Sequence, residues 1–132
     1  MSAVTRSLLA PAGSTGNNTH TSIGISPVSA RLAATLIVEA VGATPTLTWK
    51  VQVSIDDTSV TDANSTWFDL IYFTPTTNDT AAVATRVVTA VGLDVVFPDT
   101  ANDARFWRKA RLVTTANTNV TYRGELISQY RN

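Results

Sequence analysis

The 132-residue sequence contains no cysteine and a single histidine. Without cysteine, the chain cannot form disulfides, use a thiol nucleophile or bind zinc through thiolates. Small secreted domains often depend on disulfides, so their absence favours folding in a reducing cytosol. The lone histidine, His20, lies in a polar segment and has no motif partner from which a Ser-His-Asp or Cys-His set could be built. We therefore expect no catalytic residue and no enzyme activity.

Charged residues make up only 15% of the chain, and 10 Lys and Arg balance 10 Asp and Glu, so the formal net charge is zero. A neutral protein is not steered toward nucleic acid or an anionic membrane, and we expect neither as a partner. Zero net charge also weakens repulsion between copies, which makes self-association physically easy. No apolar run approaches the length of a membrane span or of a secretory signal core.

Four aspartates, Asp56, Asp57, Asp62 and Asp69, surround one polar loop and raise the question of a calcium site. Their spacing does not match the EF-hand calcium loop, which needs a glycine at its tight turn and a terminal glutamate. Aspartate side chains commonly hydrogen-bond the backbone of turns. We therefore interpret the four as turn residues, and we expect neither a metal nor a cofactor.

The clearest pattern in the chain lies between Thr46 and Ile55, where apolar and polar residues alternate without a break. Alternation with period two is typical of a strand that has one buried and one solvated face. A shift of one residue in register would expose the whole apolar face, so neighbouring strands must fix the register around it. The pattern predicts that the buried side chains are Leu47, Trp49, Val51, Val53 and Ile55.

Other stretches rich in β-branched and aromatic residues are bounded by turn-forming residues and are predicted to be strands: 23–25, 30–41, 67–73, 83–91, 95–97, 105–114 and 120–127. The alanines of residues 30–41 also suit a helix, but the β-branched residues there favour a strand. Gly42–Pro45 is expected to join that strand to the Trp49 strand as an antiparallel hairpin. Trp49, Trp67 and Phe106 are expected to fill the space between two sheets. The spacing predicts a single all-β antiparallel β-sandwich, immunoglobulin-like or jelly-roll-like, of about 7–8 strands.

Residues 1–22 are polar and rich in Gly, Ser, Asn and Thr, and we expect them to form an extended N-terminal arm before a sandwich domain at 23–132. Two interpretations remain open for this arm: it packs along its own domain, or a neighbouring subunit holds it in an assembly. In the second case, deletion of residues 1–20 should leave a folded sandwich that no longer attaches.

Basic and aromatic residues alternate between Arg105 and Arg111. Such a run can bind single-stranded nucleic acid by stacking, but on a strand it divides between two faces, so a role in a protein interface is the stronger interpretation. The candidate interface residues of the whole chain are Leu8, Leu9, Pro11, His20, Arg105, Trp107, Arg108 and Arg111.

Three motifs follow one another along the chain: Val51-Gln52-Val53-Ser54-Ile55-Asp56-Asp57, then Trp67-Phe68-Asp69-Leu70, and later Arg105-Phe106-Trp107-Arg108. In this combination, residues 30–128 resemble small β-sandwich virion proteins of tailed bacteriophages. In many of these a V-x-x-S-x-D strand leads through a loop to W-x-D-L, and an R-(F/Y)-x-R strand precedes the last hairpin. The same pattern recurs in capsid decoration proteins, tail proteins and carbohydrate-binding sandwiches.

The resemblance implies a non-enzymatic virion structural protein, with a capsid decoration (cement) protein on the outer head shell as the first expectation. Its implied partners are the major capsid protein or other virion subunits, and further copies of itself in a homo-oligomer. Its implied location is the outer capsid surface, after assembly in the host cytoplasm. A tail or head–tail connector protein and a carbohydrate-binding module are the alternatives. A tail-tube protein usually carries a long loop and an insertion helix that this sequence does not show, whereas an N-terminal arm suits decoration.

Overall fold

The computed structural model describes residues 2–25, 29–70, 73–74, 77–81, 85–96 and 107–131. Within them lie a short 3-10 turn, η1 (Asp62–Asn64), and strands β1 (Ser2–Ser14), β2 (Ile23–Gly24), β3 (Ser29–Ser54), β4 (Phe68–Asp69), β5 (Phe73–Thr74), β6 (Thr77–Ala81), β7 (Arg86–Val88), β8 (Gly92–Val96) and β9 (Lys109–Arg131). Seven strands form one antiparallel sheet, and β5 pairs separately with β6. The prediction of an all-β antiparallel fold is confirmed.

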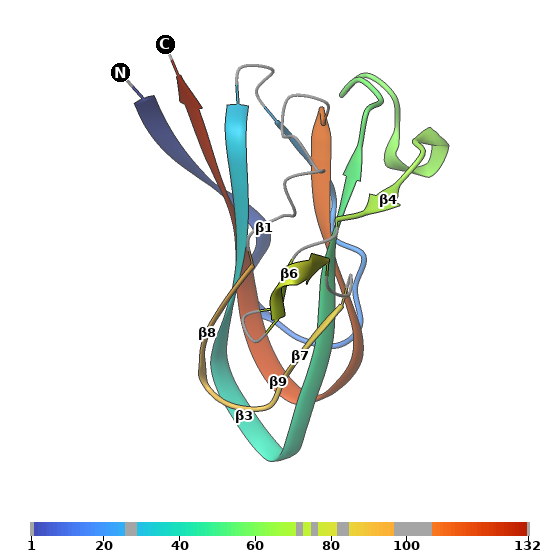
Figure 1. Ribbon diagram of the computed structural model, residues 1–132. Coiled ribbons are helices and arrows are strands. Elements are labelled where there is room, and N and C mark those ends of the chain that lie inside the picture. Colours follow the sequence, from blue (N-terminus) through green and yellow to red (C-terminus); the bar gives the residue numbers. More distant parts are fainter. Residues whose placement is uncertain are drawn as a thin grey trace.

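Two long strands, β3 and β9, form the spine of the sheet and run antiparallel along their whole length. Their pairing begins with Ser29 opposite Tyr130 and ends with Ser54 opposite Lys109. Both strands bend near their middle, and Figure 1 shows the two bends nested at the end of the molecule far from the chain termini. The bends therefore carry both strands from one side of the molecule to the other.

Each neighbouring strand pairs with only one half of β3 or β9, and the bends fold the sheet over into two layers that face one another (Figure 1). The first layer holds β1, β8 and the halves of β3 and β9 at residues 29–41 and 120–131. The second holds β2, β4, β7 and the remaining halves, residues 46–54 and 109–118. Strands that change sheets at a bend are one of the ways in which β-sandwiches form corners. The predicted sandwich is present, built from one folded sheet.

The folded-over end of the sandwich, called the closed end below, comprises residues 13–17, 40–46, 89–92 and 115–121. The described residues with positive φ all lie in these segments: Gly13, Gly16, Thr44, Gly92, Ala116 and Asn119. Residues other than glycine rarely adopt a positive φ, and this conformation persists only where the surrounding structure enforces it. Strand pairing on both sides of the corner is what enforces it here.

The core lies between the two layers and is filled by alternate residues of the long strands. In β3, Leu47, Trp49, Val51 and Val53 are all buried, as the alternation predicts. Ile55 is 58% exposed, so its predicted burial is wrong, because the strand ends at Ser54 and the chain leaves the sheet. Each large apolar side chain that is fully buried contributes roughly 1.5–3 kcal/mol relative to exposure.

Polar side chains also join the two layers. Trp49 in the second layer donates from Nε1 to Asp94 Oδ2 of β8 in the first layer, at 3.0 Å. The same carboxylate accepts from Arg86 of β7, whose Nε lies 3.1 Å from Oδ2. Gly124 is needed for close packing between the layers, since a Cβ there would lie 2.8 Å from Leu112 Cδ1 on the opposite layer.

One expectation about neighbouring segments is changed by the structure. The predicted hairpin between residues 30–41 and the Trp49 strand is wrong. Both segments belong to β3, and each of them pairs with β9 instead of with the other. Within the segment expected to form the N-terminal arm, Ser2–Ser14 is strand β1, which pairs with β9 of the same chain. Trp67 is only half-buried, and Phe106 lies outside the described residues.

Candidate interaction surfaces

The described residues contain no group of three or more His, Asp or Glu side chains placed to hold a metal ion. Nor does any helix among them have the length and apolar character needed to cross a bilayer.

One enclosed polar cluster lies on the outer side of the second layer, beneath the loop that follows β3. Lys109 is only 2% exposed, and its Nζ donates to the carbonyl oxygen of Val60 at 2.8 Å and to Ser65 Oγ. The carboxylate of Asp62 lies 3.7 Å from the same Nζ and accepts from both the backbone N and the Oγ of Ser22, at 2.9 and 2.6 Å. The cluster therefore fastens the 56–66 loop to β9 and to the segment before β2.

A serine beside a buried lysine raises the question of a nucleophile and its base, which requires a neutral lysine. Here Lys109 Nζ donates to a carbonyl oxygen and lies 3.7 Å from a carboxylate, so its hydrogen bonds are used in holding the loop. Burial alone would raise the pKa of Asp62, but the hydrogen bonds from Ser22 and the nearby Lys109 and Arg111 outweigh it and lower that pKa. The Asp62 carboxylate is thus stabilised by its neighbours, and the contacts of the cluster support a structural role.

The basic and aromatic run divides between two faces, as expected for a strand. Ala110 points into the core, while Arg111 lies on the outer face with its guanidinium carbon 4.0 Å from the centre of the Trp67 ring. Arg111 Nε also donates to Gln52 Oε1 at 2.9 Å, and burial lowers the pKa of Arg111, partly offset by Asp62. The Trp67 ring and the Arg111 guanidinium therefore form a cation–π contact within the chain.

The remaining residues of that run lie near the same end of the second layer. Trp107 is half-buried, packs against the core and lies 5.8 Å from the Phe68 ring. Arg108 is half-buried, and its backbone N donates to Ser54 O at 2.8 Å. Arg105 falls outside the described residues. Because Trp67 and Trp107 each already lie against another side chain, they do not form the open aromatic platform expected of a sugar-binding module.

His20 occupies a defined position rather than a free arm. Its Nε2 lies 2.8 Å from the hydroxyl of Tyr122, a residue with no exposed surface, and the rings meet edge to face. Thr114 Oγ1 lies 2.9 Å from the same hydroxyl, and Asn18 Nδ2 lies 3.4 Å from it. Burial lowers the pKa of His20, so the folded state favours the neutral imidazole. This cluster joins the first layer to the second, and His20 takes part in it through its contact with the Tyr122 hydroxyl.

Three predicted interface residues lie on β1, at the edge of the first layer. Leu8 is 57% exposed and Pro11 is exposed, whereas Leu9 is buried in the core of its own domain. Among the described residues β1 pairs only with β9 and makes a 13-residue edge. An open strand edge presents unpaired backbone donors and acceptors to a partner strand.

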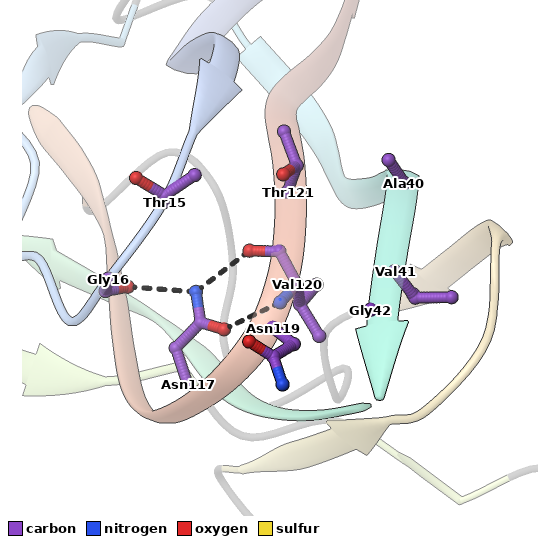
Figure 2. A pocket seen from close by; sticks show the side chains of 9 residues that line it. All are labelled: Thr15, Gly16, Ala40, Val41, Gly42, Asn117, Asn119, Val120 and Thr121. Atoms are coloured by element: carbon purple, nitrogen blue, oxygen red, sulfur yellow. Dashed lines mark hydrogen bonds between the residues drawn. The ribbon is translucent and has the colours of Figure 1, made fainter. Parts of the chain in front are cut away.

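A shallow hollow of about 480 Å³ lies at the closed end. Figure 2 shows the amide of Asn117 spanning it, with Nδ2 donating to the carbonyl oxygens of Gly16 and Val120 at 3.1 and 3.0 Å. Its Oδ1 accepts from the backbone N of Val120 at 3.1 Å. The Asn117 amide is therefore fully used in holding the bends together, and no charged side chain lines the hollow.

No known protein family matches the chain, and no curated protein does so either. Among solved structures, the SPBc2 prophage-derived protein YomS is similar over 98% of this chain and 95% of its own, with a TM-score of 0.66 at 11% identity. Chains of infectious bursal disease virus are less similar: the Gx strain gives a TM-score of 0.43 at 16% identity and the Gt strain 0.35 at 15%. These two matches cover 100% and 99% of this chain, but they cover only 32% and 31% of the viral chains. The chain therefore shares the fold of the prophage-derived protein, and the viral likenesses are too weak to support an argument.

Proposed function

We propose that this chain is a non-enzymatic structural protein of a phage particle, and specifically a capsid decoration protein that binds the outer head shell. The observation that carries the proposal is the likeness in fold, over nearly the whole of both chains, to a prophage-derived protein. The motif resemblance over residues 30–128 supports the same class. The polar clusters described above hold segments of the chain together and do not open onto a cleft. They fit a protein that binds partners without catalysing a reaction.

The proposed partners are the major capsid protein, or another virion subunit, and copies of this chain. The edge of β1 is the attachment element in this proposal. Val4 and Leu8 are 62% and 57% exposed there, on either side of Arg6, whose side chain is 71% exposed. An extended segment of a shell subunit can add to such an edge through main-chain hydrogen bonds, with side-chain contacts supplying specificity. Many copies, each with a modest interface, would then stabilise the shell through multivalent attachment.

Deletion of residues 1–20 is not a suitable test of this mechanism. The deletion removes β1, together with Leu9 and Ala10, which are 3% and 0% exposed in the core. The expectation that the truncated chain stays folded therefore conflicts with the packing, and loss of binding would report only unfolding. Substitutions of exposed residues on the edge avoid this problem.

Two experiments test the proposal. Antibody-gold labelling of the intact particle, viewed by electron microscopy, should place label over the head. Label confined to the tail or neck would replace decoration with a tail or connector role, and an unlabelled particle would overturn the virion assignment. Next, Leu8→Lys should reduce binding to particles that lack the protein, while Ile55→Lys, at a similarly exposed apolar site away from β1, should bind as the unaltered chain does. Equal binding by both variants would exclude the β1 edge.

A further inference from the structure

The segments of the closed end hold no charged residue, and one charged side chain reaches it from its margin: Glu39 is exposed, and its Oε1 accepts from Gly13 N at 2.8 Å. The four segments, 13–17, 40–46, 89–92 and 115–121, together hold 23 residues, and not one is Asp, Glu, Lys, Arg or His. At the 15% charged content of the chain, about three would be expected in a surface sample of this size. Most of these residues are exposed, so burial in the protein's own core does not explain the absence.

The four segments form one continuous surface. Asn117 Nδ2 bonds Gly16 O at 3.1 Å, and Asn119 Nδ2 bonds Ala43 O at 2.7 Å, which joins three of the segments around the hollow (Figure 2). The fourth is brought alongside by β7 and β8, since Val88 pairs with Leu47 just beyond one arm of the β3 bend. On the other arm, Gly92 pairs with Val38.

Large apolar side chains are exposed on and beside this surface. Val91 is 61% exposed and Val41 38% exposed, and Val87 and Leu93, on the strands that flank the 89–92 turn, are 63% and 65% exposed. Apolar side chains among uncharged polar ones resemble the core of a protein–protein interface, where charged residues are depleted. The surface composition therefore differs from that of the second layer toward its other end, where Asp69 and Arg111 both contact Gln52.

We infer that the closed end is a contact surface between two copies of this chain. A symmetric contact brings each patch against itself, so any charge on it would meet a like charge or its own near neighbour. The 23 residues of the closed end therefore bring no like charges together, and the carboxylate at its margin, Glu39, already accepts from Gly13 N. Its amides and hydroxyls act as both donors and acceptors, which makes a patch of Asn and Thr complementary to itself. Its 23 residues also match the roughly 20–30 residues that each side of a stable interface supplies.

This surface lies at the opposite end of the sandwich from the chain termini and from the exposed start of β1 (Figure 1). A copy bound at the closed end therefore leaves open the start of the β1 edge, around Val4 and Leu8, although β1 itself ends within the closed end at Ser14. The inference does not depend on attachment to a phage head, and the two can fail separately.

Sedimentation equilibrium of the full chain at increasing concentration is the test. The unaltered protein should reach twice the mass of one chain. Val91→Glu should raise the dissociation constant at least tenfold, because the contact would bury an unpaired charge. Ile55→Glu is the matched control: the same kind of substitution, at 58% against 61% exposure, just beyond the end of β3 that lies away from the closed end, and it should leave the dissociation constant unchanged. Thermal unfolding of both variants establishes that each is folded.

Three outcomes would overturn the inference. The first is an unaltered chain that remains a monomer at about 100 µM, above the micromolar limit usual for an interface of this size. The second is a folded Val91→Glu variant that associates as tightly as the unaltered chain. The third is an Ile55→Glu variant that weakens association as much as Val91→Glu does, which would place the contact elsewhere or make it non-specific.

Discussion

Tyr122 holds the polar contact that joins the two layers near the closed end, and Tyr122→Phe removes only its hydroxyl. The hydroxyl lies within 2.9 Å of both His20 Nε2 and Thr114 Oγ1, and 3.4 Å from Asn18 Nδ2. Because Tyr122 has no exposed surface, water cannot readily replace the lost group. The remaining partners would each have to find another bond inside the sandwich.

The expected loss of stability follows from what each partner can do without the hydroxyl. Thr114 Oγ1 still accepts from Asn18 N at 3.0 Å and has the carbonyl oxygen of Gly16 at 3.4 Å as a second choice. His20 is half-buried, and in Tyr122→Phe its Nε2 loses the hydroxyl as a hydrogen-bond partner. Two good hydrogen bonds, one of them largely replaceable, correspond to about 2 kcal/mol of unfolding free energy. For a domain of this length, that lowers the unfolding temperature by roughly 6–10 °C.

Differential scanning calorimetry and urea unfolding of Tyr122→Phe measure this effect directly. The control is Thr115→Val, which removes a hydroxyl from an exposed neighbour on the same strand and should change stability by less than about 0.5 kcal/mol. Thr114→Val should cost less in the Tyr122→Phe background than alone, since the two hydroxyls bond one another. A Tyr122→Phe variant as stable as the unaltered chain would refute the view that this cluster ties the layers together.

Two further predictions concern stability. Thr35 is 5% exposed and its Oγ1 has no hydrogen-bond partner, so Thr35→Val should raise the unfolding free energy by about 1 kcal/mol in urea titrations, and a loss would mean that the hydroxyl is satisfied. Stability should also fall in two stages as pH is lowered. The folded-state pKa of His20 lies below 6.5, so the stability from its neutral form is complete above 6.5 and is lost as pH falls through the folded pKa. The folded-state pKa of Asp62 lies below 3.8, so its contribution is complete above 3.8 and is lost below. His20→Gln should abolish the first stage and Asp62→Asn should reduce the second, and unchanged pH profiles would contradict both assignments.

The local strand pattern was predictable because alternation reports a physical constraint on each residue separately. Between Leu47 and Val53, one face had to be apolar for the layers to pack, and the sequence displays it directly. The end of that strand was missed, since Ile55 continues the alternation although the chain has already left the sheet. A residue's own type cannot reveal where its neighbour strand stops pairing.

The folded sheet was not predictable from local pattern. Gly42–Pro45 has the composition of a hairpin turn, and whether its flanking segments pair with one another or with a third strand depends on β9, more than sixty residues away. Lys109 gave no signal of burial either, because its partners, Val60 and Ser65, lie in a loop distant in sequence. Interaction surfaces are harder still to predict from the sequence. The lack of charged residues in the segments of the closed end is recognised only when four segments that are separate in the sequence are placed side by side.

The two proposed surfaces have a joint consequence for attachment. Each chain offers its β1 edge at one end and the uncharged closed end at the other, so a dimer joined at the closed ends would carry two edges (Figure 1). Two linked edges bind a repetitive surface far more tightly than one, because the second contact forms within an already attached complex. Val91→Glu should therefore weaken particle binding as well as self-association, although it leaves β1 intact, whereas Leu8→Lys should weaken particle binding alone. Particle binding that is insensitive to Val91→Glu would show that single copies attach independently, and that dimer formation, if measured, serves another purpose.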